Sequence, residues 1–361
     1  MKKVKLGEIC EIQAGGTPSR NKKEFWAQGN IPWVKIKDIN SKYISKVEEH
    51  ITELGLQFSS AKLFSRGTIL YTIFATIGEV AILDIDAATN QAIAGLYLKS
   101  EKVLKDYLYF FLLSIKNRVK NDSRGVAQNN INLTYLKNIE VPIVENSIQQ
   151  EICNNLTKIN QIITQRNQQL IELSNLVKSR FNEIFGDPLN NDKMFAVKTG
   201  QQCFKFSSGK LLDKNDRVFE GYPAYGGNGI AWKSRNYLID NPTIIIGRVG
   251  AYCGNVRTSH GKAWISDNAI YIKEFKNLDF NLVFLLELMK VIDFSRFADF
   301  SGQPKITQKP LEKQKYIVPP LDLQNEFADF VAQVDKSQLA IQKSLDELET
   351  LKKSLMQEYF G

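Results

Sequence analysis

Two stretches of this 361-residue sequence decide its fold: LIELSNLVKSRFNEIFG at residues 170–186 and LDELETLKKSLMQEYFG at residues 345–361. The second matches the first at a fixed offset in the numbering, and the same offset aligns Ile131 with Ile306. Similarity at a fixed offset is the mark of a repeated architecture. The sequence therefore predicts two copies of one scaffold, each made of a lobe followed by a tail.

The tails, residues 147–186 and 322–361, are predicted to be long helices, because apolar residues recur in them at steps of three and four. Such a sustained spacing indicates a helix that buries one stripe against another helix. A lobe separates the tails in the sequence, so we expect them to pair antiparallel as a coiled coil, with the lobes at opposite ends. The residues expected to pair the helices are Leu156, Ile159, Ile163, Leu170, Leu173 and Val177 in the first tail, and Val331, Val334, Ile341, Leu345, Leu348 and Leu355 in the second.

The lobes, residues 1–146 and 187–321, are predicted to be mixed domains with more strand than helix. Short β-rich segments, such as 68–73 and 243–246, lie among Gly and Asn residues. The expected fold class is α+β, with two repeated mixed α/β lobes separated by two long antiparallel helices. One amphipathic helical stretch is expected in each lobe, near residues 107–119 and 282–295.

Positive charge is concentrated in the lobes. Of the net charge of +8, the first lobe carries +5, the first tail +1, the second lobe +6 and the second tail −4. Two basic lobes suit a polyanion such as DNA. No apolar run approaches the roughly 18 residues of a membrane span, and the start MKKVKLGEIC lacks the apolar core of a secretory signal. Four scattered cysteines suit reduced thiols, so we expect a cytoplasmic protein that binds no membrane.

The motifs of common enzymes are missing from the sequence. It has neither a GxxxxGK[ST] phosphate loop nor a GxSxG nucleophile elbow. Its two histidines, His50 and His260, lack a second ligand at helical metal spacing. The string nearest to a base-methylation pocket, residues 241–244, lacks the second proline and the aromatic residue of such a pocket. We therefore expect no catalytic residue, no metal and no cofactor on this chain.

Loops rich in Gly, Asn, Gln and basic residues recur in both lobes. Arg and Lys pair with guanine and Asn and Gln with adenine, whereas other Lys side chains hold phosphates. Each loop alone is compatible with an ordinary turn, but the recurrence in both copies favours nucleic-acid binding. The candidate DNA-binding residues are Arg20, Lys22, Lys23, Lys35, Lys37, Arg124, Gln128, Asn129 and Asn130 in the first lobe, and Tyr225, Asn228, Lys233, Arg235, Arg248, Gln303 and Lys305 in the second.

The order of lobe, helix ending in FNEIFGDP (residues 181–188), second lobe and matching helix resembles the specificity subunit of type I restriction–modification systems along essentially the whole chain. The first lobe departs from the family's commoner Ser-Gly-Gln-Pro string, so Gln128 has a less defined role than Gln303. The strings that look like the family's target-recognition domains are IPWVKIKDI (residues 31–39), YPAYGGNGI (residues 222–230) and SGQPKI (residues 301–306).

The resemblance implies a subunit that chooses a DNA site and has no catalysis of its own. Each lobe would read one half of a bipartite site, and the helices would set the spacer and dock methylation subunits. The implied partners are double-stranded DNA, two methylation subunits that bind S-adenosylmethionine and methylate adenine, and restriction subunits that use ATP and Mg. Three other interpretations stay open: a coiled-coil adaptor that does not bind DNA, the specificity partner of a fused restriction–methylation enzyme, and an enzyme of an unrecognised type.

Overall fold

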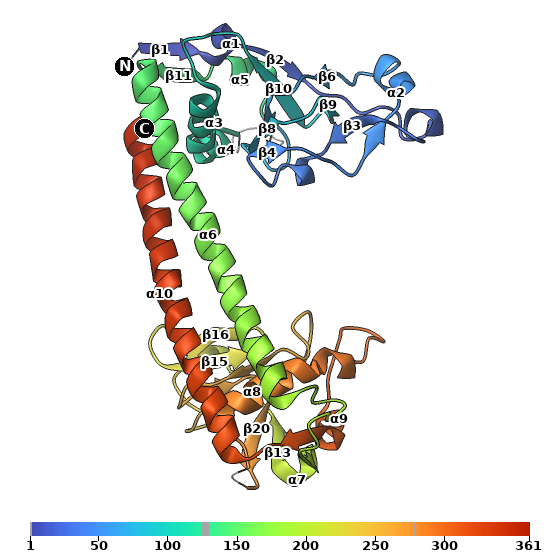
Figure 1. The fold of residues 1–361 in the computed structure, drawn as a ribbon, viewed down its shortest axis with the longest axis vertical. Helices are drawn as coiled ribbons and strands as arrows, with labels where there is room; N and C mark the ends of the chain where they lie inside the picture. The colour runs from blue at the N-terminus through green and yellow to red at the C-terminus, as the bar shows by residue number, and fades with distance from the viewer. Residues whose placement is uncertain (1, 124–129, 278) are drawn as a thin grey trace. The chain divides into compact units, whose positions relative to one another are not determined.

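The structure is a computed structural model that describes residues 2–123, 130–277 and 279–361. The chain forms two compact units: unit 1 contains Met1–Arg166 and Ser344–Gly361, and unit 2 contains Asn167–Lys343. Each unit combines one lobe with parts of both long helices (Figure 1). These units differ from the four segments predicted from the sequence, because each long helix packs part of its length against a lobe.

The first lobe contains a sheet with the strand order β2-β10-β7-β8-β4 and another with the order β5-β3-β9-β6. A separate pairing of β1 with β11 joins the start of the lobe to the strand before the first long helix. The elements are β1 (Lys2–Lys5), α1 (Leu6–Ile9), β2 (Cys10–Ala14), β3 (Ile31–Val34), β4 (Tyr43–Ile44), β5 (His50–Ile51), α2 (Glu53–Gln57), β6 (Leu63–Phe64), β7 (Ile69–Thr72), β8 (Val80–Leu83), β9 (Ala87–Thr89), β10 (Ile93–Leu98), α3 (Lys105–Ser114), α4 (Lys116–Ser123), α5 (Leu133–Lys137) and β11 (Glu140–Ile143).

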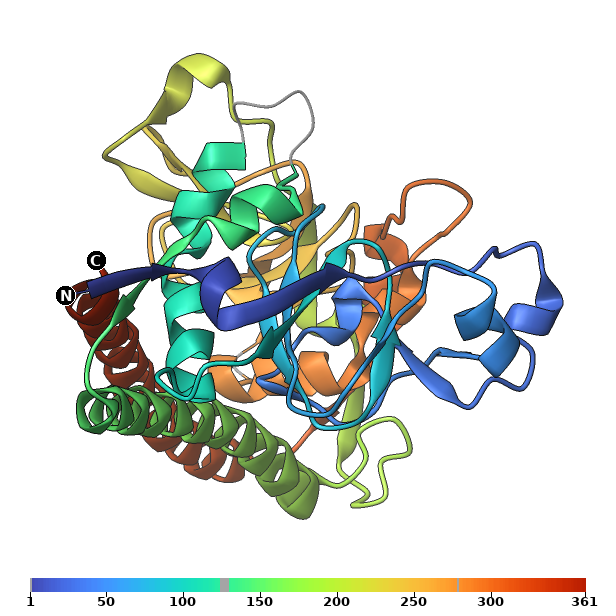
Figure 2. The same cartoon turned by 90° about the horizontal axis from the view of Figure 1, so that it is seen from above.

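Strand β7 is apolar on both faces because both faces are covered. Successive side chains of a strand point to opposite faces. Ile69 and Tyr71 pack in the main core with α3, whereas Leu70 packs on the other face with residues of the second sheet. Helix α3 lies between the sheet β2-β10-β7-β8-β4 and the parts of the long helices that belong to unit 1 (Figures 1 and 2).

The second lobe repeats this plan with different details. One sheet has the order β13-β20-β17-β18, another the order β14-β16-β15-β19, and β12 pairs with β21. The elements are β12 (Ala196–Thr199), α7 (Gly200–Cys203), β13 (Phe204–Ser208), β14 (Arg217–Val218), β15 (Tyr222–Gly226), β16 (Gly229–Ser234), β17 (Ile244–Gly247), β18 (Val256–Thr258), β19 (Trp264–Ile265), β20 (Ala269–Phe275), α8 (Leu282–Ile292), α9 (Gln308–Lys313) and β21 (Lys315–Val318).

Residues at equivalent positions of the repeat point to equivalent faces of the sheet in the two lobes. Ile244 and Ile246, which the offset of the repeat aligns with Ile69 and Tyr71, pack in the main core of unit 2 with α8. Ile245 packs on the opposite face, in the cluster that contains Tyr225 and Ile265. The same strand thus forms the centre of both lobes. The predicted helical stretches also exist, as α3 with α4 in one lobe and α8 in the other.

The tails form the two long helices, α6 (Asn146–Phe185) and α10 (Leu321–Phe360), of 40 residues each. At 1.5 Å per residue, each is about 60 Å long. In unit 2, Gln338 donates to the Ser174 hydroxyl at 3.1 Å, and Arg180 lies 3.1 Å from Glu326. The partner number falls as the α6 number rises, so the two helices run antiparallel there, as predicted.

In unit 1, the first turns of α6 contact the last turns of α10 (Figure 1). The Asn155 amide donates to the Tyr359 hydroxyl at 3.3 Å. The ring of Phe360 lies in the main core with Leu156, and its centroid is 5.2 Å from that of Tyr107. The last turn of α10 is therefore part of the core of the first lobe.

A fully buried glutamine fastens each lobe to its long helix, and we call this contact the glutamine clasp. The clasp residues are Gln149 on α6 and Gln324 on α10, and each is 0% exposed. In both, the side-chain oxygen accepts from the backbone N–H just before α3 or α8, and the amide donates to two carbonyls. The distances are 2.8, 2.8 and 2.9 Å from Gln149 to Leu104 N, Lys102 O and Val144 O, and 2.9, 2.9 and 2.8 Å from Gln324 to Asn281 N, Asp279 O and Pro319 O.

Among the residues that the structure describes, no helix has the length and apolar character to cross a lipid bilayer.

Candidate nucleic-acid interface

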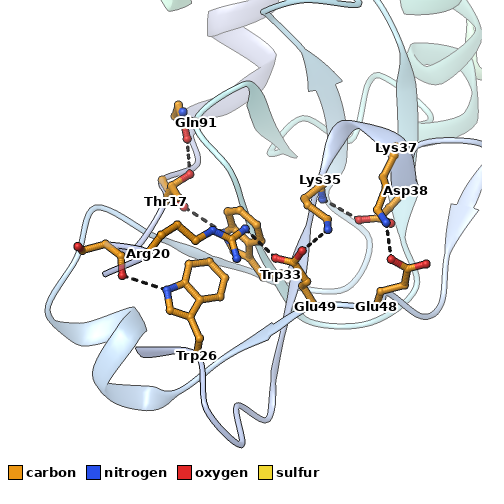
Figure 3. Close-up of polar contacts among 12 residues, drawn as sticks. Thr17, Arg20, Trp26, Trp33, Lys35, Lys37, Asp38, Glu48, Glu49 and Gln91 are labelled. Atoms are coloured by element: carbon orange, nitrogen blue, oxygen red, sulfur yellow. Dashed lines mark hydrogen bonds and ion pairs between the residues drawn. The ribbon is translucent and has the colours of Figure 1, made fainter. Parts of the chain in front are cut away.

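The basic loop of the first lobe begins where β2 ends, at Gly15 and Gly16. A Cβ atom on Gly15 would collide with the side chain of Thr89, and one on Gly16 with a neighbouring backbone segment. Only glycine allows such close approaches. The hydroxyl of Thr17 then donates to Gln91 (Figure 3). These contacts hold the start of the loop against the strands and fix where the basic residues emerge.

Arg20 lies on an aromatic platform built by two tryptophans (Figure 3). Its guanidinium carbon is 3.7 Å from the ring centroid of Trp26 and 4.8 Å from that of Trp33. The two rings meet edge to face at 5.0 Å. Their indole N–H groups donate to the backbone carbonyls of Ser19 and Gly16, at 3.0 and 3.1 Å. The attraction between cation and ring therefore holds the guanidinium in one orientation.

Two adjacent glutamates form ion pairs with three of the predicted DNA-binding cations and offset two of their three charges (Figure 3). Glu49 pairs with Arg20 at 2.7 Å and also with Lys35, whereas Glu48 pairs with Lys37. The hydrogen bond from Lys35, supported by Arg20, lowers the pKa of Glu49. The bond from Lys37 lowers the pKa of Glu48 in the same way. Both carboxylates are ionised at neutral pH, so this surface carries less positive charge than its basic residues suggest.

The other candidates of the first lobe differ in their surroundings. Lys22 and Lys23 are exposed and have no ion pair within the described part of the chain. The Lys22 ammonium lies 4.9 Å from the ring centroid of Phe25. Asn130 forms an antiparallel backbone bridge with Phe74. Three candidates, Arg124, Gln128 and Asn129, lie outside the described residues.

The second lobe contains a pocket of about 430 Å³ beside the turn between β15 and β16. The predicted residues Asn228 and Gln303 both line it, and Asn268 adds a third amide. Trp232 supplies an aromatic wall. Gly229 closes the turn with a φ of +111°, a conformation that L side chains rarely adopt. The structure thus brings together two candidates that lie in widely separated loops of the sequence.

Three arginines gather at this pocket without a carboxylate partner among the described residues. Arg217 lines the pocket, and its guanidinium carbon lies 4.6 Å from the ring centroid of Trp232. Arg257 donates to the carbonyl of Gly227 at 3.3 Å, and Arg248 donates to another backbone carbonyl at 3.3 Å. The Nε atoms of all three are buried and have no hydrogen-bond partner within the described chain. A guanidinium in the wall of a pocket, as Arg217 supplies here, suits a ligand rich in acceptor oxygens.

The remaining candidates of the second lobe divide into exposed and buried residues. Lys233, Arg235 and Lys305 are exposed. Tyr225 is only 4% exposed and packs with Ile245 in a buried cluster between the two sheets of the second lobe. The alternation of β15 turns its side chain into the lobe, so a DNA base has no access to it. We correct the prediction by removing Tyr225 from the candidate interface.

The predicted helix-pairing residues lie partly in the cores of the units and partly along the helices. In unit 2, Leu173 and Val177 pack in one cluster with Val331 and Val334. Those in or against the core of unit 1 are Leu156 and Leu355. Ile159 and Leu345 are buried, and the positions with intermediate exposure are Ile163, Leu170, Ile341 and Leu348.

Sequence reasoning missed several residues that shape these sites. Trp26 and Glu49 position the cations of the first lobe, and Arg217 and Trp232 form one wall of the pocket. A signal existed only for the tryptophans, which lie close in the sequence to a predicted cation. The ion pairs and the pocket depend on loops that are distant in the sequence.

The site chemistry visible here is that of non-covalent recognition: charged donors, amides and aromatic faces. The described residues contain no group of three or more His, Cys, Asp or Glu that could hold a metal ion. Burial raises the pKa of Cys10 to about 12 and the pKa of Cys153 to about 11. Both thiols are therefore protonated at neutral pH, whereas the thiolate is the nucleophilic form.

Comparison with known proteins matches the chain to a family. The model of the type I restriction modification DNA specificity domain matches residues 1–174 and 193–351. The specificity subunit of the EcoprrI type I restriction enzyme from Escherichia coli is 24% identical over 374 residues, which cover 97% of this chain and 90% of that protein. The MjaIX specificity subunit from Methanocaldococcus jannaschii is 32% identical over 236 residues, covering 60% of this chain and 54% of that protein.

Solved structures have the same fold. The S subunit of the type I restriction-modification system from M. genitalium has a TM-score of 0.62 at 19% identity, covering 100% of this chain and 96% of that one. A chain from a structure on the complex assembly and conformational transition of the type I R-M system has a TM-score of 0.63 at 17% identity, with 99% and 97% covered. Because the family model matches most of the chain, the protein belongs to the type I restriction-modification DNA specificity family.

Proposed function

We propose that each lobe reads one half of a bipartite DNA site, and that the paired helices set the spacer between the halves. The observation that carries this proposal is the repeat: two lobes share a core plan and differ in the groups they expose. One lobe presents an arginine on an aromatic platform, and the other an amide-lined pocket with arginines. Different surfaces on one scaffold are what recognition of two unlike half-sites requires.

Phosphate contacts supply the binding that does not depend on sequence. Lys22 and Lys23 in the first lobe and Lys233, Arg235 and Lys305 in the second are exposed cations. Each phosphate they neutralise releases counterions from DNA, which makes the affinity fall with rising salt. Arg20, Asn228 and Gln303 are the residues to which we assign base contacts, since their side chains make the planar paired bonds that distinguish bases.

The repeat also supports two equivalent docking surfaces for a partner subunit. Leu176 on α6 in unit 2 is 47% exposed, and Leu351 on α10 in unit 1 is 48% exposed. The offset of the repeat aligns these two leucines, so they occupy the same position in the two copies. An exposed leucine at matching positions suits two copies of one partner, and we assign them to two methylation subunits. These subunits would hold S-adenosylmethionine, and restriction subunits in the same complex would use ATP and Mg.

The experiment is methylome sequencing of a host with and without this chain, its partner genes being unchanged. We expect one bipartite motif to lose methylation when the chain is removed. The purified complex should bind a duplex with that motif more tightly than a scrambled duplex, with a strong salt dependence. An unchanged methylome with no salt-sensitive binding would instead favour an adaptor that does not bind DNA.

A further inference from the structure

The pocket of the second lobe has a shape that a stacked base pair cannot enter. Base edges in B-DNA lie at the floor of a groove about 8.5 Å deep, so a protein reads them with parts that protrude. The amides of Asn228, Asn268 and Gln303 instead line a hollow of about 430 Å³. Although all three amides are exposed at the surface, a base can enter the hollow between them only if it has left the helix.

The groups around the pocket match what holds an extruded base in other proteins: stacking on an aromatic ring and hydrogen bonds to the freed base edge. Trp232 lines the pocket and is 54% exposed, so much of its indole surface is available. The three amides offer both donors and acceptors. Arg217 lines the pocket and lies over the same indole, so its positive charge is suited to the phosphate of an extruded nucleotide.

A second, independent feature lies next to the pocket. Phe219, in the turn between β14 and β15, is 100% exposed, so its ring packs in none of the described cores. It lines a neighbouring hollow that shares Arg217, Ile230 and Trp232 with the pocket. Exposed apolar side chains of DNA-binding proteins insert between base steps and unstack them. Phe219 is placed to fill the gap that an extruded base leaves in the duplex.

We infer that the second lobe rotates one nucleobase out of its half-site, holds it in this pocket against Trp232, and inserts Phe219 into the space that it vacates. This inference rests on the proposed function, because it assumes that the second lobe docks on duplex DNA. The ligand of the pocket would be a single unpaired nucleobase. The amides of the pocket would then contact this extruded base, whereas other residues contact bases that stay stacked.

The test uses the complex of the full chain with its methylation subunits, and a duplex carrying the motif found by methylome sequencing. The analogues 2-aminopurine and pyrrolocytosine, whose fluorescence rises on unstacking, replace each adenine and each cytosine of the second half-site in turn on both strands, the methylated adenines excepted. We expect a severalfold increase at one position. Phe219→Ala and Trp232→Ala should abolish most of it, Trp232→Phe should retain it, and Phe58→Ala, at an exposed phenylalanine of the first lobe, should leave it unchanged.

The outcomes distinguish the inference from the proposed function. Tight, motif-specific binding without a fluorescence increase at any position would overturn the extruded base and leave half-site recognition intact. An increase that survives both alanine variants would also overturn it, since the base would then be held elsewhere. Failure to distinguish the motif from a scrambled duplex would contradict the proposed function itself. Phe219 is fully exposed, so its variant tests the wedge without disturbing the fold.

Discussion

The two lobes carry nearly the same net charge, +5 and +6, but they arrange it in different ways. In the first lobe, Arg20, Lys35 and Lys37 are paired with carboxylates. In the second, none of the five arginines has a carboxylate within ion-pair distance among the described residues. The net charge of a lobe therefore does not show how many of its cations are available to bind DNA. The first lobe thus displays a few oriented cations paired with carboxylates, whereas the arginines of the second keep their full positive charge and donate to neutral groups such as the carbonyls of Asp267 and Gly227.

The largest expected effect comes from replacing one lobe. Exchanging residues 1–130 for the lobe of another family member should change one half of the methylated motif completely and leave the other half unchanged, because the two lobes have separate cores. Methylome sequencing measures both halves at once. The reciprocal exchange of residues 187–305 serves as the control and should change the opposite half. A change in both halves from one exchange would show that the lobes are not independent readers.

The glutamine clasp tests whether the two lobes are fastened equally. Gln149→Leu and Gln324→Leu each remove three hydrogen bonds to backbone groups, which should lower the free energy of unfolding by about 3 kcal/mol. Urea unfolding of the purified chain measures the loss. Gln150→Leu, at an exposed neighbour, is the matched control and should change little. A large loss at only one clasp would break the equivalence of the two copies.

The free arginines of the second lobe should contribute more to binding than the paired arginine of the first. Arg217→Gln should weaken binding of the motif duplex by about 1–3 kcal/mol, the usual range for a lost base or phosphate contact by arginine. Arg20→Gln should weaken binding less. Arg20 has to break its ion pair with Glu49 before it can contact DNA, and the loss of that pair offsets part of the binding energy. Fluorescence anisotropy of the complex on labelled duplex measures both. Equal losses would show that ion pairing does not distinguish the lobes. Arg66→Gln, at another exposed ion pair of the first lobe that is not among the candidate DNA-binding residues, is the control.

The smallest expected effect concerns Glu49 itself. Glu49→Gln frees Arg20 and Lys35 and should steepen the dependence of log affinity on log salt by about 1, as one more phosphate contact would. Because the pKa of Glu49 is lowered, its ion pairs are present above that pKa and are lost only as the pH falls through it. Glu53→Gln, at an exposed position, controls for charge alone. An unchanged salt slope would place this pair outside the DNA contact.

The sequence was most informative where structure depends on local periodicity. The spacing of apolar residues predicted α6 and α10, and the β-rich segments 68–73 and 243–246 were predicted as strands and form β7 and β17. It was wrong for Tyr225, because its position among glycines concealed the alternation of β15. The pairing of Glu49 and the pocket depend on contacts between loops whose paths no local pattern determines. The sequence therefore identified Asn228 and Gln303 as candidates, but it did not predict that they line the same pocket.

The glutamine clasp has a consequence for how such proteins diversify. Among the residues that the structure describes, Gln149 and Gln324 bond on the lobe side only to backbone N–H and carbonyl groups, which every residue other than proline provides. A foreign lobe therefore has to place its backbone correctly at the glutamine clasp, but it does not need particular side chains there. Recombination between genes at the codons for the helix entries would yield a joint that already fits. New specificities could thus arise by shuffling whole lobes, without a series of compensating point mutations.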